Sequence, residues 1–176
     1  MKHVALLQGI NLGRKRRIAM ADLRELMTEL GFEDVKTHLQ SGNVVFSAGK
    51  DANKAAATIE RGIAKRFDMK VSVVIRTARE LADIVAGNPL PEGEKDGAKL
   101  QVVFLSERPG SDPVKDIDDD DFLPEKVVAK GRELYVWYAN GMQRSRLARE
   151  LSKRTSDVPA TSRNWNTVTK LCDLAG

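Results

Sequence analysis

Residues 35–46 read VKTHLQSGNVVF, and this stretch decides the fold of the first half of the chain. Two short runs of extended character, 35–39 and 44–46, stand on either side of Ser41-Gly42-Asn43. Glycine and asparagine accept the positive φ angles that tight turns require, so the stretch predicts a β-hairpin.

Elements before and after this hairpin complete a regular pattern. The apolar run 4–7 predicts a strand, and Asp51 is placed to cap a helix. Alternation at Val71, Val73 and Ile75 predicts another strand. Two sets of apolar residues recur at helical spacing: Met20, Leu23, Leu26, Met27 and Leu30, then Ala55, Ala56, Ile59, Ile63 and Phe67. Residues 1–76 therefore predict the order βαββαβ, which is the split βαβ or ferredoxin-like unit.

Residues 77–176 predict a second α+β unit. All six prolines lie after residue 88, where the character of the chain changes. Thr77 caps a predicted helix, residues 100–105 predict a strand, and 109–124 a turn with a short acidic helix. A second hairpin is expected to turn at Lys130-Gly131, and Ser145 and Thr161 are expected to cap the last two helices. The fold class predicted is α+β, with two ferredoxin-like units packed together, and an internal duplication is our hypothesis for the repeated order.

The composition favours a globular protein with no membrane partner. The 176 residues are 41% hydrophobic and 31% charged. No apolar run approaches the roughly 20 residues that span a bilayer, and no small-residue cleavage site follows Met1. Cys172 is the single cysteine, which excludes an internal disulfide. These features predict a cytoplasmic location.

Charge is distributed unevenly along the chain. Residues 1–76 hold 14 basic and 8 acidic side chains, residues 77–142 hold 8 and 14, and residues 143–176 hold 7 and 3. In one interpretation each segment only solvates its own exterior. In the other, the first and last segments form a basic surface that faces an anion.

The sequence contains no familiar set of catalytic or metal-binding residues. The run Asp118–Asp121 lacks the glycine and the closing glutamate of a calcium loop. His3 and His38 are the only histidines and have no metal-ligand spacing. No nucleophile elbow occurs. We therefore predict no metal and no cofactor, and catalytic residues stay unassigned.

Two polar segments near the N-terminus are candidates for anion binding. Gly9-Ile10-Asn11-Leu12-Gly13 follows a predicted strand and precedes a predicted helix, which is the context of phosphate binding, but it matches neither the P-loop nor the dinucleotide pattern. Residues 14–17 add four consecutive cations. They form either a solvated, mobile tip or an arm that contacts phosphates.

The segment 161–167 is the third candidate. With Thr161 as the cap, Arg163 and Asn164 would lie in the first helical turn, where free backbone N–H groups and the helix dipole favour an anion. Arg163 could hold a carboxylate or phosphate with two parallel hydrogen bonds. Asn166 would point away from the core face that Trp165 begins.

Four motifs, in order, resemble the domain-of-unknown-function family 1697. They are residues 5–13 (ALLQGINLG), 20–24 (MADLR), 40–46 (QSGNVVF) and 161–168 (TSRNWNTV). The resemblance spans nearly the whole chain. It implies a bacterial cytosolic protein built from two ferredoxin-like units, and it implies no established activity or catalytic residues.

The sequence leads to one preferred function and two alternatives. The preferred function is a binding module for a small anionic or nucleotide-like ligand, held by Asn11, Gly13, Gln40, Ser41, Asn43, Arg163, Asn164 and Asn166. The first alternative is a nucleic-acid-binding protein that uses Arg14, Lys15, Arg16 and Arg17. The second is an enzyme of unassigned class in which Arg163 stabilises negative charge.

Overall fold

The computed structural model of the chain describes residues 1–49 and 51–176. The chain forms two compact units: Met1–Asp83 with Lys170–Gly176, and Ile84–Thr169. The divisions fall inside two helices, α3 (Ala78–Ala86) and α5 (Trp165–Ala175).

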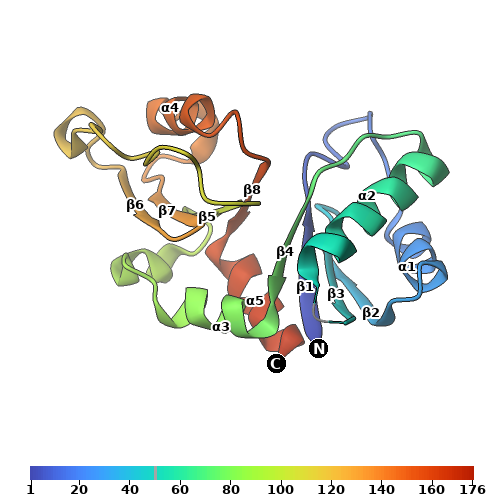
Figure 1. Ribbon diagram of the computed structural model, residues 1–176. Coiled ribbons are helices and arrows are strands. Elements are labelled where there is room, and N and C mark those ends of the chain that lie inside the picture. Colours follow the sequence, from blue (N-terminus) through green and yellow to red (C-terminus); the bar gives the residue numbers. More distant parts are fainter. Residues whose placement is uncertain (50) are drawn as a thin grey trace. The chain divides into compact units, whose positions relative to one another are not determined.

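The first unit is a four-stranded antiparallel sheet with two helices (Figure 1). Its elements are β1 (Lys2–Leu7), α1 (Met20–Glu29), β2 (Glu33–His38), β3 (Asn43–Ser47), α2 (Ala52–Phe67) and β4 (Val73–Thr77). The strand order β2-β3-β1-β4 places the first strand at the centre, as in the ferredoxin-like unit. The βαββαβ prediction and the hairpin at residues 35–46 are therefore confirmed.

Helices α1 and α2 cover one face of this sheet and form the core of the unit (Figure 1). Leu23 and Met27 of α1 and Ile59 of α2 are fully buried in one cluster with Leu7 and Phe46 of the sheet. Asp51 caps α2 by accepting a hydrogen bond from the Lys54 N–H, as expected. The alternating apolar residues of the strands thus supply one wall of the core, and the helical repeats supply the other.

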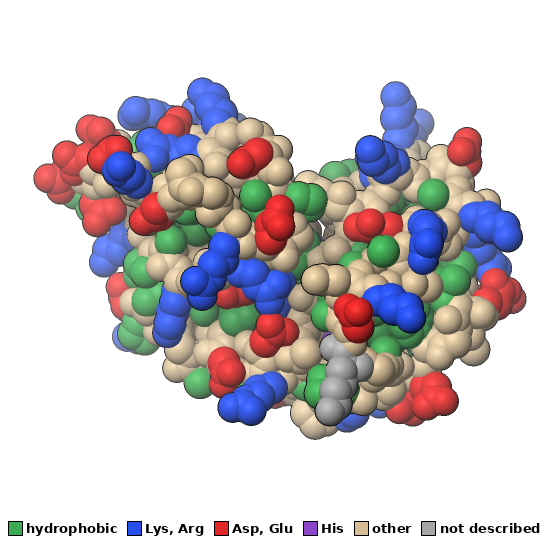
Figure 2. Space-filling model, in the orientation of Figure 1, with side chains coloured by type: hydrophobic (Ala, Val, Ile, Leu, Met, Phe, Trp, Pro, Cys, Tyr) green, Lys and Arg blue, Asp and Glu red, His purple; other side chains and the backbone are tan. Residues whose placement is uncertain are grey.

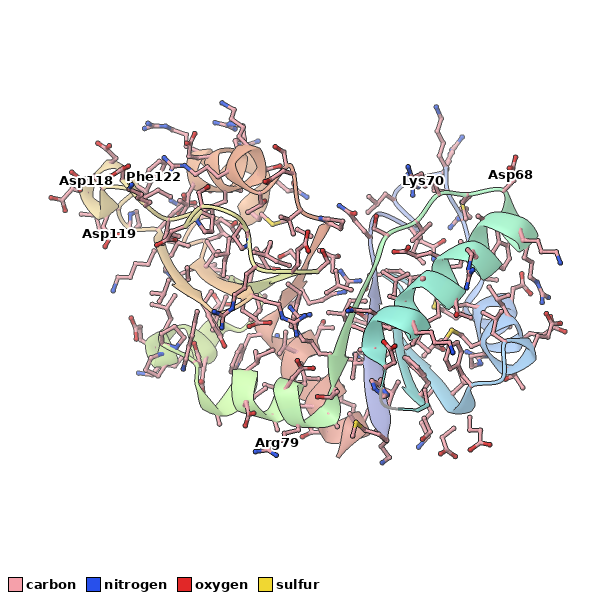
Figure 3. All side chains as sticks on the ribbon, in the orientation of Figure 1. Asp68, Lys70, Arg79, Asp118, Asp119 and Phe122 are labelled. Carbon is pink, nitrogen blue, oxygen red and sulfur yellow. The ribbon has the colours of Figure 1, made fainter. Side chains whose placement is uncertain are left out.

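The second unit holds another four-stranded antiparallel sheet, in the order β6-β7-β5-β8. Its elements are η1 (Pro91–Asp96), β5 (Leu100–Leu105), η2 (Asp119–Asp121), β6 (Lys126–Lys130), β7 (Glu133–Trp137), η3 (Met142–Arg144), α4 (Arg146–Arg154) and β8 (Ala160–Asn164). Ser145 caps α4 through the Ala148 N–H, as expected. Between β5 and β6, where the first unit has α1, the chain contains only the short helix η2, and Figure 3 shows Asp118 and Asp119 at the outer edge of the second unit.

The two sheets agree in strand order and in register. In the first, Ala5 lies opposite Val44 on one side and Ile75 on the other. In the second, Val103 takes the same place between Leu134 and Ser162. The same alignment matches Arg76 of β4 with Arg163 of β8, because they face Val4 and Val102. This correspondence is what an internal duplication produces.

One predicted element is wrong. The sequence predicts that Thr161 caps the last helix, whereas residues Ala160–Asn164 form strand β8 and the helix α5 begins at Trp165. Thr161 instead lies opposite Phe104 in the ladder with β5. Asn164 takes the capping role, since its Oδ1 accepts a hydrogen bond from the Thr167 N–H. Arg163 and Asn164 are consequently not in a first helical turn.

None of the described helices is long and apolar enough to cross a membrane.

Candidate functional site

The segment between β1 and α1, residues 9–18, is here called the basic loop. The hydrogen bonds of Asn11 connect the two ends of this loop, and they are called the Asn11 brace below. The Asn11 side chain donates to the Ile18 carbonyl at 2.9 Å and to the Gln40 carbonyl at 2.7 Å, and it accepts from the Ile18 N–H at 2.9 Å. Its backbone N–H also donates to the Arg16 carbonyl. Asn11 has a φ of +54°, a conformation that asparagine adopts more readily than most residues. The brace closes the loop at its base.

The hairpin turn, residues 39–42, packs against the base of the basic loop. The Leu7 N–H donates to the Gly42 carbonyl at 2.8 Å. A Cβ on Gly42 would lie 2.7 Å from Cδ1 of Ile10 and 2.8 Å from Cβ of Leu7, so only glycine fits there. Gly42 also has a φ of +83°. The sequence motifs at residues 9–13 and 40–43 are therefore brought together.

The polar side chains of this turn divide into internal and exposed groups. Asn43 is fully buried and donates to the His38 carbonyl and to Ser41 Oγ. Gln40 and Ser41 are exposed, and the Gln40 carbonyl is the acceptor of the Asn11 bond. Asn43 thus holds the turn in shape, while Gln40 and Ser41 lie at its surface beside the basic loop.

The four cations at residues 14–17 are all exposed. Arg16 has a φ of +57°, and its Nη2 donates to the Lys70 carbonyl at 2.8 Å. Lys70 is labelled in Figure 3 at the end of α2 where the basic loop also lies, and Figure 2 shows Lys and Arg side chains projecting from that end of the first unit. Within residues 1–49 and 51–176, none of these four side chains takes part in an ion pair.

The third predicted segment lies in the second unit and has internal roles. Arg163 is 7% exposed, and its Nη1 donates to Thr161 Oγ1 at 2.7 Å and to the Ser162 carbonyl at 2.8 Å. Burial lowers the pKa of Arg163 to about 10. Asn164 caps α5, and the exposed Asn166 has its Oδ1 against the backbone of Gly97. Trp165 is buried, as the sequence predicts.

The amides of Asn11 and Asn43, which the sequence predicts to contact a ligand, make hydrogen bonds to carbonyl groups within the protein. Ligand contact by these two residues stays a prediction. Nothing in a single sequence separates these uses, because the same amide satisfies a ligand or a carbonyl. Among the described residues, no group of three histidine, cysteine or acidic side chains could hold a metal ion.

Two antiparallel sheets, each with the first strand central, define a protein of two ferredoxin-like α+β units. The chain belongs to the family of proteins of unknown function DUF1697, whose model matches residues 1–135, and this range contains the first three of the four motifs.

One similar solved structure is that of the conserved bacterial protein SP0830 from Streptococcus pneumoniae. It is 19% identical, with a TM-score of 0.71, over 99% of this chain and 98% of that chain. At this identity the likeness supports the fold alone. A comparison with curated proteins gives no match.

Proposed function

We propose that the first unit binds a small anionic, phosphate-bearing ligand through the basic loop. The observation that carries this proposal is the Asn11 brace, because it fixes the base of a loop whose four consecutive cations are exposed. A braced loop loses less conformational entropy when it binds than a mobile one does. This favours a binding arm over a freely solvated tip.

The electrostatics of the loop support an anionic partner. Four adjacent positive charges repel one another, and no described carboxylate pairs with them. An arriving phosphate relieves that repulsion and accepts charge-assisted hydrogen bonds from arginine in a planar, two-point geometry. Gln40 and Ser41, on the adjoining turn, have exposed side chains. The hydrogen bond from Asn11 to the Gln40 carbonyl holds this turn beside the basic loop, so both side chains can contact a ligand bound there.

A small ligand is favoured over nucleic acid by the aromatic residues. Recognition of single-stranded RNA depends on exposed aromatic side chains on which bases stack. Of the aromatic residues on the described strands, Phe46, Phe104 and Tyr135 are buried, and only Trp137 of β7, in the second unit, is partly exposed. The alternative is a nucleic acid that the protein contacts only through its phosphates. Titrations with small ligands and with an oligonucleotide distinguish this alternative from a small ligand. Ligand contacts by Arg163, Asn164 and Asn166 stay a prediction of the sequence.

Isothermal titration calorimetry with pyrophosphate, ATP and a mixed-sequence oligonucleotide tests the proposal. The variant Arg14→Gln/Lys15→Gln/Arg17→Gln removes three loop charges. The matched control Lys54→Gln/Arg61→Gln/Lys65→Gln removes three exposed charges from α2, so both variants have the same net charge. We expect the loop variant to lose about tenfold or more in affinity for pyrophosphate or ATP, because each lost charge-assisted bond is worth about that factor. The control should bind as the wild type does.

Two outcomes would contradict the proposal. One is the absence of heat with every ligand at low salt, and the other is an equal loss of affinity in both variants, which would reflect net charge alone. Tight binding of the oligonucleotide only, with a steep loss at high salt, would favour the nucleic-acid alternative.

A further inference from the structure

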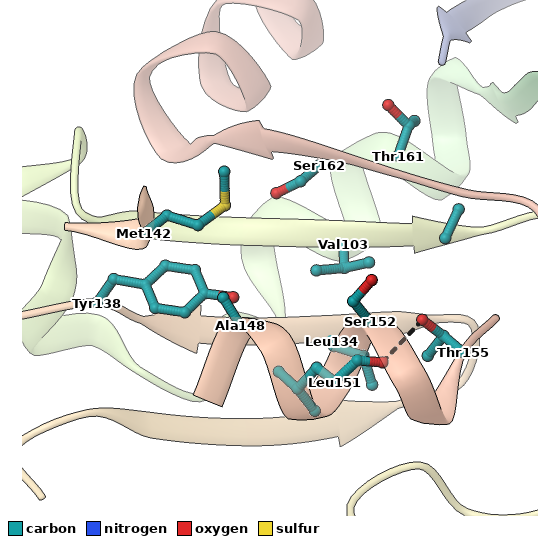
Figure 4. Close-up of a pocket in the computed structure, with 11 residues that line it drawn as sticks. Val103, Leu134, Tyr138, Met142, Ala148, Leu151, Ser152, Thr155, Thr161 and Ser162 are labelled. Atoms are coloured by element: carbon teal, nitrogen blue, oxygen red, sulfur yellow. Dashed lines mark hydrogen bonds between the residues drawn. The ribbon is translucent and has the colours of Figure 1, made fainter. Parts of the chain in front are cut away.

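A cavity of about 180 Å³ lies in the second unit, on the face of its sheet that α4 covers (Figure 4). Its walls come from strands β5, β7 and β8, from α4, and from the exposed Met142. None of the residues that line it carries a formal charge. The residues that line this cavity belong to the second unit, whereas the basic loop belongs to the first.

The register of the two sheets explains why the cavity exists. Val73 and Ile75 of β4 are buried in the core of the first unit, under α2. The matching positions of β8, opposite Leu105 and Val103, are Ala160 and Ser162. Two large apolar side chains are thus replaced by a methyl group and a hydroxymethyl group, and space is left above the strand.

The position of α4 keeps this space open. Leu147 and Leu151 of α4 pack on Leu134, Val136 and Tyr138, at and just beyond β7. In the first unit α2 packs directly on β4. The face of β8 that carries Ala160 and Ser162 therefore has no helix filling the space above it, and both residues stay partly exposed.

One hydroxyl of the cavity wall belongs to a largely buried side chain and has no protein partner in the described part of the chain. Tyr138 is 2% exposed, and within the described residues its hydroxyl makes no hydrogen bond. Three other hydroxyls of the wall have partners: Thr155 donates to the Leu151 carbonyl, Thr161 accepts from Arg163, and Ser162 donates to Gln101. The hydroxyl of Ser152 belongs to an exposed side chain. The Tyr138 hydroxyl oxygen is not sealed from solvent, so it can exchange a hydrogen bond with water or with a molecule in the cavity.

We propose that this cavity binds a small, uncharged, single-ring molecule that exchanges one hydrogen bond with the Tyr138 hydroxyl. The volume supports this size, because an apolar cavity of about 150 Å³ accepts a benzene molecule. The uncharged lining supports the charge, since burying an ion without a counter-charge is costly. Burial, with a smaller contribution from Glu125, raises the pKa of Tyr138, which keeps the phenol protonated as a donor.

Amide chemical shifts of the full chain, followed during titration with phenol, toluene and benzoate, test the inference. We expect phenol and toluene to shift amides around Val103, Ala148 and Ser162, and benzoate to leave them unchanged. Tyr138→Phe should weaken phenol about fivefold to tenfold, the loss of one hydrogen bond, and leave toluene nearly unaffected.

Ser162→Leu supplies the decisive variant, because it restores bulk at the position where the first unit has Ile75. We expect it to abolish the shifts with both phenol and toluene, and Ala160→Leu to do the same if the first variant does not fold. Ser156→Leu, at an exposed position outside the cavity, is the control. Any of three results would overturn the inference. The first is that the wild type shows no shifts with phenol, and the second is that the Leu variants bind phenol and toluene as well as the wild type does. The third is that Tyr138→Phe changes the affinities for phenol and toluene by the same factor.

Discussion

At the scale of single residues, Asn11 is the side chain that determines the shape of the basic loop. We expect Asn11→Ala to lower the free energy of unfolding by about 2 kcal/mol, because Ile18 and Gln40 lose their partners and alanine is strained at positive φ. Urea denaturation measures this. Asn53→Ala, on the exposed surface of α2, should change stability little, and an equal effect of both variants would contradict the brace.

Gly42 tests the contact between the hairpin turn and the basic loop. Gly42→Ala places a methyl group against Ile10 and Leu7 at a φ of +83°, so we expect a loss of about 2 kcal/mol or more. Gly49→Ala is the matched control, because a Cβ at that position meets nothing within 4 Å. Thermal unfolding compares the two variants, and a tolerated Gly42→Ala would show that the turn and the loop do not meet closely.

The two tyrosines of the chain give the second unit a pH signature. Burial, aided by Glu133, raises the pKa of Tyr135 to about 12, and burial also raises that of Tyr138. Because the folded pKa values exceed the unfolded ones, this stabilisation is complete below about pH 10 and is lost as the pH rises toward 12. Absorbance at 295 nm should show almost no phenolate at pH 10 in the native protein and about half in urea. Equal titration in both states would contradict the burial.

At the scale of the elements, both strands that lead directly into helices end in a capping residue. Thr77 Oγ1 accepts from the Glu80 N–H ahead of α3, and Asn164 Oδ1 accepts from the Thr167 N–H ahead of α5. We expect Thr77→Ala and Asn164→Ala each to cost about 1 kcal/mol, and Thr77→Ser to cost much less. Differential scanning calorimetry measures these changes. An unchanged stability in Asn164→Ala would contradict the assignment of Asn164 as the cap.

The same elements show how far the sequence alone could go. Strands such as β1 and helices such as α2 have regular apolar spacing and a cap, so local pattern predicts them. Strand β8 reads ATSRN, which has no apolar alternation, and Thr161 resembles a helix cap. Pairing with β5 decides its conformation, and that long-range interaction leaves no local signal.

In the candidate site too, local sequence predicts some features, and others depend on long-range contacts. Local sequence could predict an exposed cationic loop next to a glycine turn, because four consecutive basic residues cannot be buried without partners. It could not predict that Asn11 bonds to Gln40, 29 positions away, or that Arg163 is buried beside Thr161. These contacts depend on the sheet that brings distant strands together.

At the scale of the whole molecule, two units with the same sheet register have different interiors. The first fills its core with Val73 and Ile75, while the second has Ala160 and Ser162 at those positions and a cavity that is partly open to solvent. The two units therefore differ in what they expose: the first carries four exposed cations on the basic loop, and the second has a cavity with an uncharged lining.

The proposed role of the basic loop depends on where an anion binds to the chain. Mapping amide chemical shifts during titration of the full chain with pyrophosphate answers this directly, because each unit reports separately. We predict saturable shifts at Gly13, Arg14, Lys15 and Arg17 and at Gln40, which disappear in the variant that lacks three loop charges. Shifts confined to other surfaces, or no saturable shift at low salt, would contradict the account.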